Sequence, residues 1–562
     1  MLPTPDATPP PTATPEPTAT PEPAATPAPT PTVIATPAPE AGAAVAILVS
    51  DPDERARLEA ALAAAADFGP AAAAEARWAV ADAPLPGSRP VVLARWAAIT
   101  DQRRDVLDLD RADVPGILRG EVPDWSRIGG SPQPLVPYLP ASQAPLIAGA
   151  LGIALDDLAA ELIPDAELVD LVARTPGAIA LIEPEQLRIG VLALTVDGHD
   201  PYRDPARDSP LSMVRWVRAP GLNDVVKLAA ALGLEAAPPF DPAGMLTTGD
   251  LIPVRCSNFV LSLLDDYGAM FDGVRDAIAA ADIAVVPLDS SLTDLGEPTP
   301  CVETFTLQGS PRTVDAAAEA GVDVMLTNGN HMLDCWGGCS NEGALLDTLK
   351  RLHEAGIATA GAGEDLEAAR TPAVVRVHTA NGFVRFAFLG YDTVASWYEA
   401  GEDSPGTAPL DRSIVRDDVI AARAIADHVV VGANWGIEET ADPTTVQREI
   451  GGIAIESGAS FVLGSHPHWV QAVEHFDDAL VTYSSGNFVF DQDWSVETTQ
   501  GMVTELGFTR ERLIGYRIRP IVIRGDGGEV HWIYRPEFVD PAGEGRPILE
   551  RVWQAQDRLP AR

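Results

Sequence analysis

Polar side chains that could hold a metal ion follow five separate apolar segments in the second half of the chain. These side chains are Asp250, Asp289, Asn330 with His331, Asn434, and His466 with His468. The carboxyl ends of strands line the ligand crevice of α/β sheets, so we expect the five positions to converge. Carboxylate, amide and imidazole donors together suit a divalent metal such as Mn, Fe or Zn. Two such metals about 4 Å apart would activate water for a hydrolytic displacement.

The pair His466 and His468 is the most compact part of this set. On an extended segment the side chains of residues i and i+2 point the same way, so we expect both imidazoles to reach one metal cluster. Asp250 is expected to ligate or bridge the metals, and His331 to protonate a leaving group or brace a bound anion. Taken alone, each residue has an ordinary alternative, such as a turn former for Asp250. The remaining histidines are interpreted as ordinary surface or core residues: His199, His353, His378, His428, His475 and His531.

The apolar segments that precede these polar residues are predicted strands. They cover residues 244–248, 283–287, 322–327, 428–431 and 460–464, with a helix at about 273–281 before the second of them. The alternation of strand and helix patterns predicts an α/β domain over residues 244–540, followed by a C-terminal tail over 541–562.

The first half of the chain divides into three parts. Residues 1–42 are almost entirely Pro, Thr, Ala and Glu, with 14 of the 51 prolines in the first 40 residues. This composition predicts a disordered, semi-rigid stalk. Residues 43–218 predict a smaller α/β domain that begins with an apolar run at 44–50 and a helix from about Pro52 to Ala66. Residues 219–243 predict one helix and then a linker rich in Pro and Gly.

The charge of the chain excludes several classes of partner. Lys and Arg total 39 against 81 Asp and Glu, which gives a net charge of −42 over 562 residues. Such a balance argues against a nucleic-acid binder that tracks phosphates, and against docking on anionic lipid. No stretch approaches the roughly 18 apolar residues of a membrane span.

The cysteines point to a location outside the cytoplasm. An even number of cysteines beside a Pro/Thr-rich stalk fits two disulfides, and Cys335–Cys339 with Cys256–Cys301 is the first pairing to test. Unpaired buried thiols are the alternative. The start Met1-Leu2-Pro3 shows no export signal, so we expect that the signal was removed or that the start lies elsewhere. A disordered tail on a cytosolic protein is the other reading.

Residues 244–540 resemble the CapA family of capsule or poly-γ-glutamate biosynthesis, which is itself similar to calcineurin-like metallophosphoesterases. The matching stretches are Gly249-Asp250 with Arg255, Thr327-Asn-Gly-Asn-His331 with Asp334, Trp435-Gly-Ile-Glu438, Gly464-Ser-His-Pro-His468, and Tyr483-Ser-Ser-Gly-Asn-Phe-Val-Phe-Asp491. The resemblance implies a four-layer α/β/β/α sandwich with a cleft for two divalent metals, Mn, Fe, Zn or Mg.

The resemblance also implies roles for individual residues. By position, the metal ligands are Asp250, Asp289, Asn330, Asn434, His466 and His468, and the catalytic group is His331 with Asp334 and Arg255. Asp289 stands where the family has a glutamate, and Asn434 where it has a histidine. Both side chains can still coordinate, and we expect them to weaken the second metal and to favour harder ions.

Residues 43–218 resemble the PstS-like group of type II periplasmic binding proteins. The resemblance rests on the stretch from Gly116 to Gly130, on Pro176-Gly-Ala-Ile-Ala180 and on Val196-Asp-Gly198. That family cradles phosphate with a Ser-Gly-Thr turn at a helix N-terminus. The corresponding place reads Ala141-Ser-Gln-Ala144, which predicts a degenerate domain that binds another ligand or serves as a spacer.

Together these features predict an exported protein of capsule or exopolymer synthesis or attachment that hydrolyses a phosphoester or an envelope polymer. We expect an anionic polymer and a capsule-synthesis membrane complex as partners, with Arg255, Arg312 and Lys350 as the candidate basic contacts. A non-catalytic scaffold of an export machine is the first alternative, and the Asn434 replacement favours it. An anion sensor in which the first domain gates the second is another.

Overall fold

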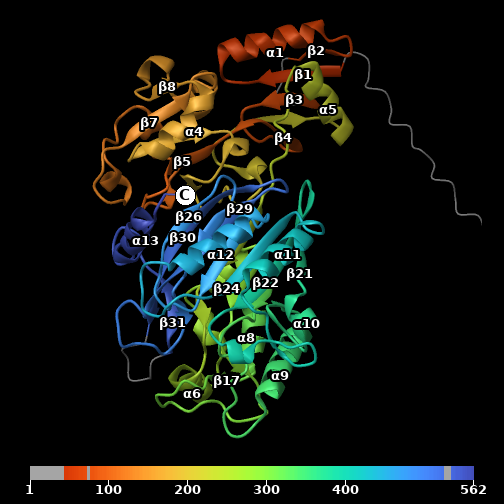
Figure 1. Cartoon of the computed structure of the whole chain (residues 1–562). Helices are drawn as coiled ribbons and strands as arrows, with labels where there is room; N and C mark the ends of the chain where they lie inside the picture. The colour runs from red at the N-terminus through yellow and green to blue at the C-terminus, as the bar shows by residue number, and fades with distance from the viewer. Residues whose placement is uncertain (1–42, 72–75, 525–532, 562) are drawn as a thin grey trace, which may run out of the picture.

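The computed structural model describes residues 43–71, 76–524 and 533–561. The stalk expected over residues 1–42 lies outside the described residues, as does His531. An N-terminal domain, red to yellow in Figure 1, lies above a C-terminal domain coloured green to blue. In these described ranges, every helix is too short or too polar to traverse a lipid bilayer.

The C-terminal domain contains two large sheets. The first has the order β19 (Ala358–Ala360), β18 (Val324–Leu326), β15 (Ile283–Pro287), β13 (Ala243–Thr247), β29 (Gln500–Phe508), β30 (Leu513–Arg524) and β31 (Arg535–Phe538). The second has the order β21 (Ala373–Thr379), β22 (Gly382–Asp392), β24 (His428–Asn434), β25 (Phe461–Ser465), β27 (Leu480–Thr482) and β26 (Val473–His475). The strands that precede the predicted site residues pair in parallel, so their carboxyl ends lie along one edge of each sheet.

The two sheets pack face to face, and helices cover their outer faces. Successive residues of a strand point to opposite faces. Val285 therefore joins Val430 and Leu463 in the core cluster between the sheets, whereas Ala284 packs outward. The outward cluster includes α6 (Arg255–Leu264), α8 (Arg312–Ala320) and α9 (Asn341–Glu354), and α11 (Arg412–Arg423) and α12 (Thr445–Glu456) cover the second sheet. The expected α/β/β/α sandwich is confirmed (Figure 1).

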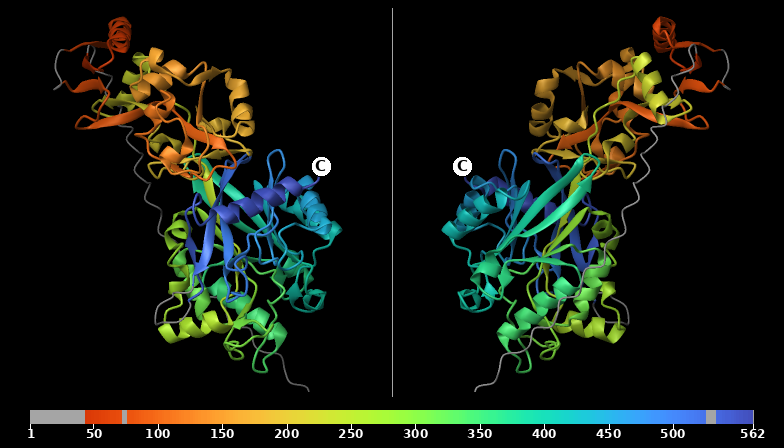
Figure 2. Two further views of the ribbon diagram at one scale, coloured as in Figure 1. Left: turned by 90° about the vertical axis from the view of Figure 1, so that its left-hand side faces the viewer. Right: turned by 90° about the vertical axis from the view of Figure 1, so that its right-hand side faces the viewer.

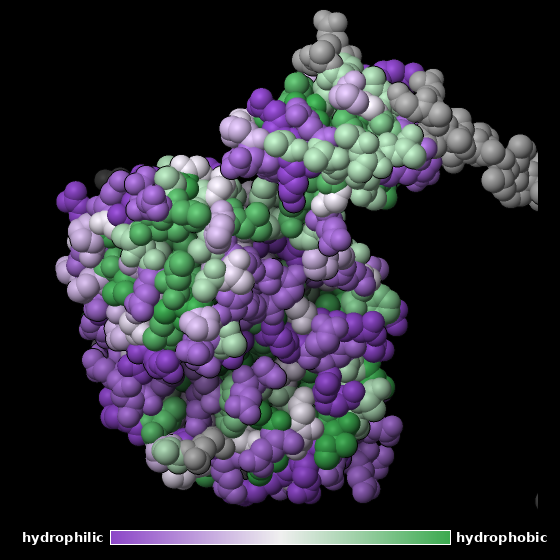
Figure 3. Space-filling model, turned by 90° about the horizontal axis from the view of Figure 1, so that it is seen from above, coloured by the Kyte–Doolittle hydropathy of each residue, from purple (hydrophilic) through white to green (hydrophobic). Residues whose placement is uncertain are grey.

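The N-terminal domain is also α/β and consists of two lobes. One sheet has the order β2 (Phe68–Pro70), β1 (Ala43–Leu48), β3 (Trp78–Ala81), β12 (Ser212–Arg218) and β4 (Ser88–Arg95). The other has the order β10 (Val191–Ala193), β5 (Ala97–Asp101), β9 (Ala178–Ile182), β7 (Val136–Pro140) and β8 (Glu161–Ile163). The lobe with β1 projects away from the C-terminal domain (Figure 2), and the space-filling view from above shows one part of the molecule projecting from the rest (Figure 3).

Two segments outside the predicted domains pack into them. The helix expected in the linker is α5 (Leu222–Ala231), and its Leu228 shares a core cluster with Val45 of the β1 lobe. The residues expected as a C-terminal tail contain α13 (Arg546–Arg558), whose Val552 lies in the core cluster between the two sheets. Each helix has one apolar face, which explains why it docks on a domain.

Both disulfides that we expected first are present. Cys256 pairs with Cys301, and Cys335 pairs with Cys339. Each bridge begins next to a predicted site residue, because Cys256 follows Arg255 and Cys335 follows Asp334. The bridges therefore anchor two of the loops that surround the site.

Candidate metal centre

The predicted site residues meet where the strands of the two sheets end. The Oδ2 atom of Asp250 lies 3.3 Å from Nδ1 of His468 and accepts a hydrogen bond from the backbone N–H of His466 at 3.1 Å. The Nδ1 atom of His466 lies 3.1 Å from Oδ1 of Asn330. Asp289 accepts a hydrogen bond from the backbone N–H of His331 at 2.8 Å. Residues from both sheets thus form one polar cluster.

The carboxylates of Asp250 and Asp289 are buried, and only one oxygen of each accepts a hydrogen bond in the described part of the chain. Asp250 is 1% exposed and Asp289 2% exposed. Among the described residues, Oδ1 of Asp250 and Oδ2 of Asp289 have no hydrogen-bond donor. Burial and the negative charge of Asp250 raise the pKa of Asp289 to about 6, against the opposing charge of His331. A cation held by these carboxylates would offset this repulsion.

Hydrogen bonds fix the orientation of both imidazoles. His468 Nδ1 lies 2.8 Å from Oδ1 of Asn487, whose amide nitrogen donates elsewhere, so Nδ1 of His468 carries the proton. His466 Nδ1 donates to Asn330 in the same way. Each ring therefore keeps the lone pair on Nε2 for a metal. Burial and the neighbouring His468 lower the pKa of His466 to about 3, which keeps this ring neutral.

The backbone of the His-Pro-His segment is not extended, contrary to our expectation. The φ angles of His466 and His468 are 90° and 58°, in the left-handed region that non-glycine residues rarely adopt. Strand β25 ends at Ser465, and the hydrogen bond from His466 N–H to Asp250 holds the turn. The ring centroids still lie 5.9 Å apart, because the turn rather than strand alternation brings the two imidazoles together.

Glu438 is a potential ligand that we did not predict. Its carboxylate lies with the imidazoles of His466 and His468 in a group whose ligand atoms are all within 4.8 Å of one another. Gly436, with φ of 91°, turns the chain after β24 so that Glu438 returns toward the site. The side chain is 51% exposed and marks the side of the cluster that is open to solvent. The sequence signal that could have identified Glu438 is its place at the end of the Trp435–Glu438 stretch, which matches the CapA family.

Asn434 supports Asn330 in this structure. Its Nδ2 donates to Oδ1 of Asn330 at 2.9 Å and to Oδ1 of Asp392 at 2.8 Å, and its Oδ1 accepts from Ser465. The amide nitrogen therefore faces the cluster, because both of its neighbours there are acceptors. Asp392, at the end of β22, is a further buried carboxylate that we did not predict, and burial raises its pKa.

His331 belongs to a chain of hydrogen bonds that runs away from the metal cluster. Its Nδ1 lies 2.6 Å from Oδ2 of Asp334, and Oδ1 of Asp334 accepts from the hydroxyl of Tyr398 at 3.1 Å. Burial lowers the pKa of His331, but the bond to Asp334 and nearby carboxylates outweigh it and raise the pKa. A histidine held in this way by a carboxylate is suited to donate a proton from Nε2.

Arg255 does not contact the metal cluster. Its guanidinium forms a buried ion pair with Asp491, donates to the carbonyl oxygen of Thr304 at 3.0 Å and lies over the ring of Phe490. Arg255 itself has a left-handed φ of 46°. The structure thus places Arg255 as a brace between the loop after β14 (Asp250–Leu251) and the segment after β28 (Asn487–Val489).

The degenerate turn of the N-terminal domain is occupied by the chain's own carboxylate. Asp165 accepts hydrogen bonds from the backbone N–H and the hydroxyl of Ser142, just before α3 (Ala144–Leu151). The neighbouring Gln143 accepts from the indole of Trp96 at 2.6 Å. These donors are therefore not free for an external phosphate at this position.

The residues of the C-terminal cluster fit a divalent cation. Among the described residues, two buried carboxylate oxygens lack donors, two imidazoles present lone pairs, and the carboxylate of Glu438 lies on the solvent-exposed side. Oxygen and imidazole donors of this kind hold Mn, Fe or Zn. The C-terminal domain is thus an α/β/β/α sandwich with a polar cluster at the ends of its strands.

Comparison with known proteins shows a family that this domain resembles. Residues 244–492 match the sequence model of the family described as "Bacterial capsule synthesis protein PGA_cap". The C-terminal domain is therefore similar to the capsule and poly-glutamate synthesis proteins of this family.

Two relatives illustrate this similarity. "Capsule biosynthesis protein CapA" of Bacillus anthracis is 31% identical over 194 residues, which are 34% of this chain and 45% of the relative. "PGA biosynthesis protein CapA" of Bacillus subtilis is 28% identical over 250 residues, 44% of this chain and 63% of the relative. The chain thus spans about half the length of these curated relatives.

Solved structures resemble separate parts of the chain. An ABC-type phosphate transport receptor from Vibrio cholerae covers 34% of this chain and 93% of its own, with 16% identity and a TM-score of 0.22. NAD nucleotidase from Haemophilus influenzae covers 55% of this chain and 61% of its own, with 10% identity and a TM-score of 0.30.

Proposed function

We propose that the C-terminal domain is a metal-dependent hydrolase that acts on a phosphoester or on a capsule-type polymer outside the cytoplasm. The observation that carries the proposal is the pair of buried, donor-free oxygens of Asp250 and Asp289 beside His466 and His468. Leaving such atoms unpaired costs free energy unless a cation binds there. A metal held at this place would polarise the substrate and supply an activated water.

The chain's own residues then have distinct tasks. Asp250, Asp289, Glu438, His466 and His468 would hold the metal ions. Asn330 would add a neutral oxygen donor once Asn434 releases its Oδ1. Asn487 and Asn434 orient these ligands from outside. His331, held by Asp334, would donate its Nε2 proton to the leaving group. Asn434 stands where the CapA family has a histidine. We propose that it positions Asn330 and that the second metal ion binds weakly beside it.

The proposal is tested by metal content and turnover. After incubation with Mn²⁺ and desalting, we expect bound metal in the full chain by elemental analysis, and hydrolysis of bis(p-nitrophenyl) phosphate. His466→Ala should lose both, whereas His331→Ala should keep the metal and lose turnover. The matched control is His353→Ala, a change on α9 whose imidazole contacts only Thr359 in the described hydrogen bonds. Absence of metal from the wild-type protein would overturn the proposal.

We place the protein in the cell envelope, in contact with an anionic polymer. The two disulfides are typical of oxidising compartments. The three basic side chains considered as polymer contacts are already paired, Arg255 with Asp491, Arg312 with Asp265 and Lys350 with Glu354. Metal ions would therefore have to provide the positive charge that a polyanion requires. A capsule-synthesis membrane complex is the corresponding assembly partner.

A non-catalytic scaffold is the second candidate, and the hydrogen bonds of Asn434 favour it. Its Nδ2 satisfies Oδ1 of Asn330 without a metal, which stabilises a cluster with fewer open coordination positions. Under this function the protein would bind polymer with the metal present and show no turnover. Replacement of Asn434 by His separates the two functions, because an enzyme limited by its second metal should gain activity.

A further inference from the structure

A cavity of about 480 Å³ lies at the junction of the two domains, and residues of both domains line it. Its N-terminal wall comes from the segments around β6 (Asp108–Leu109) and β11 (Thr195–Val196), and its C-terminal wall from β29, β30 and the segment after β31. None of the residues of the metal centre is part of this lining. The volume is that of a small-molecule site, and such sites are common at domain interfaces.

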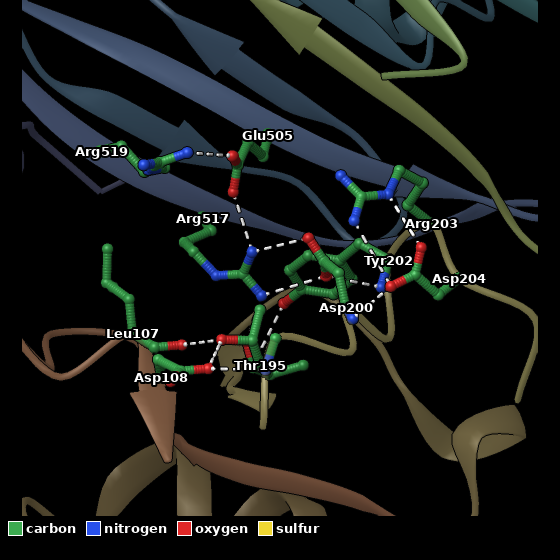
Figure 4. A network of polar contacts seen from close by, with 12 residues as sticks. Leu107, Asp108, Thr195, Asp200, Tyr202, Arg203, Asp204, Glu505, Arg517 and Arg519 are labelled. Atoms are coloured by element: carbon green, nitrogen blue, oxygen red, sulfur yellow. Dashed lines mark hydrogen bonds and ion pairs between the residues drawn. The ribbon is translucent and has the colours of Figure 1, made fainter. Parts of the chain in front are cut away.

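Some charges of this cavity hold the two domains together. Nη1 of Arg517 donates to Asp200 at 2.9 Å and to Glu505 at 2.8 Å, which joins the N-terminal domain to β29 and β30 (Figure 4). Nη2 of Arg517 donates to the carbonyl oxygen of Ala193. The Nε–H group of Arg517 has no acceptor among the described residues, although the side chain is only 2% exposed. A buried guanidinium N–H without an acceptor is costly and points to a missing partner.

Two further guanidinium groups in the lining use only part of their donors. Arg519 donates from Nη1 to Glu505 at 3.0 Å, and its guanidinium stacks on the ring of Phe538 at 3.5 Å. Arg203 donates from Nε and Nη2 to Asp204, and Figure 4 shows this pair at the right, with Arg519 at the left. The remaining N–H groups are suited to a planar carboxylate, which guanidinium groups bind with two parallel hydrogen bonds.

Carboxylates with a free oxygen line the same cavity. Oδ1 of Asp108 accepts from Thr195 and from the backbone of Gly198, and Oδ1 of Asp540 accepts from the backbone of Ala542. The second oxygen of each is available. The lining contains five carboxylates and three guanidinium groups, so a simple anion such as phosphate would meet net negative charge. A ligand that carries an ammonium group in addition to a carboxylate matches both the guanidinium groups and the carboxylates of the lining.

We propose that this cavity binds a zwitterionic amino acid and that the ligand bridges the two domains. Its carboxylate accepts from the N–H groups of Arg519 that are not bonded to Glu505. Its ammonium group donates to the free oxygens of Asp108 and Asp540. The ring of Phe538 and the apolar residues of the lining contact the side chain of the ligand.

The test is a binding screen on the full chain. Thermal melting and calorimetry with the common L-amino acids are compared with inorganic phosphate, acetate and methylammonium at equal concentration. We expect at least one amino acid to bind with one-to-one stoichiometry and to raise the melting temperature, whereas the three single-charge probes leave it unchanged. Arg519→Gln and Asp108→Asn should each weaken binding by about tenfold or more, because each removes a charge-assisted contact.

The controls separate this site from general charge effects. Arg412→Gln on α11 breaks an exposed pair with Glu449 of α12 and should leave binding unchanged. Asp540→Asn provides a second carboxylate variant if Asp108→Asn impairs folding. The proposal is overturned if no amino acid binds, if phosphate alone binds, or if the Arg519 and carboxylate variants bind as well as the wild-type protein.

Discussion

At the scale of single residues, the metal centre depends on which atoms are paired and which are free. Asn487 and Asn330 use their oxygens to hold Nδ1 of His468 and of His466, and so direct both Nε2 atoms toward the ligand position. Asp250 and Asp289 each keep one buried oxygen without a donor. The two asparagines thus orient the imidazoles, and the buried carboxylates supply the negative charge.

Removal of the outer support of His468 should weaken metal binding without removing a ligand. For Asn487→Ala we expect Mn²⁺ affinity to fall about 10–100-fold, because the ring loses the acceptor that fixes its tautomer. Calorimetric titration with Mn²⁺ measures the change. The control is Asn381→Ala, a change at an exposed position whose amide contacts only the carbonyl oxygen of Pro239 in the described hydrogen bonds. Equal affinity in the two variants would contradict the orienting role of Asn487.

The lowered pKa of His428 makes the free energy of unfolding depend on pH. Burial lowers the pKa of His428 to about 4, and the neutral ring is bonded to Ser460 and to the carbonyl oxygen of Thr509. The unfolded chain binds a proton at higher pH than the folded one. The contribution of His428 to the free energy of unfolding is therefore fully present above about pH 6.5. It falls by about 3 kcal/mol in all as the pH drops toward 4. Urea unfolding at pH 7 and pH 4.5 should show a smaller difference for His428→Gln than for the wild-type protein.

At the scale of elements, strand ends and tight turns bring the site together. The central strands are buried on both faces, and each ends in a loop that carries a polar residue. The loop after β18 passes so close to Asp289 that a Cβ on Gly329 would lie 2.1 Å from Oδ1 of that carboxylate. Close backbone approach is thus part of the site, in addition to side-chain chemistry.

Gly329→Ala should therefore displace Asp289 and lower metal occupancy. We expect loss of more than half of the bound Mn²⁺ and destabilisation by about 1–3 kcal/mol, the usual cost of overpacking. Elemental analysis and urea unfolding provide the two measurements. Gly149→Ala in α3 is the matched control, because a Cβ there meets no atom within 4 Å, and it should be neutral or stabilising by up to about 1 kcal/mol. The same metal content in both variants would exclude the steric explanation.

At the scale of the whole molecule, buried charges and α13 join the two domains. Arg517 of β30 is paired with Asp200 of the N-terminal domain, and Arg546 of α13 with Asp105. The guanidinium of Arg517 holds the pKa of Asp200 below its usual range, although burial alone would raise it. The mutual orientation of the domains, and with it the interdomain cavity, depends on these pairs.

Asp200→Asn should weaken this interface. The change leaves Arg517 buried with one anionic partner fewer, so we expect a loss of about 3 kcal/mol in the free energy of unfolding. We also expect faster proteolysis between the domains, around residues 232–242. Urea unfolding and limited proteolysis measure both effects, with Arg412→Gln as an exposed control that should show neither. An unfolding midpoint equal to that of the wild-type protein would contradict a docking role for Asp200.

Most elements of the C-terminal domain could be predicted from local sequence. The strands at 283–287 and 322–327 are apolar runs that end in polar residues, and local composition is enough to identify them. The same pattern identified Asp250, Asp289, Asn330, His331 and His466 as neighbours, because parallel strands place their carboxyl ends on one edge. The family resemblance rests on these same short stretches.

The tertiary structure alone determined how the site residues are paired. Asp250 and His466 are 216 positions apart, and no local pattern predicts that the carboxylate of one accepts from the backbone of the other. The left-handed turns at His466 and His468, the support of Asn330 by Asn434, and the inclusion of Glu438 all depend on such distant contacts. Residue type and strand position are local properties of the chain, whereas hydrogen-bond partners are properties of the packed sheets.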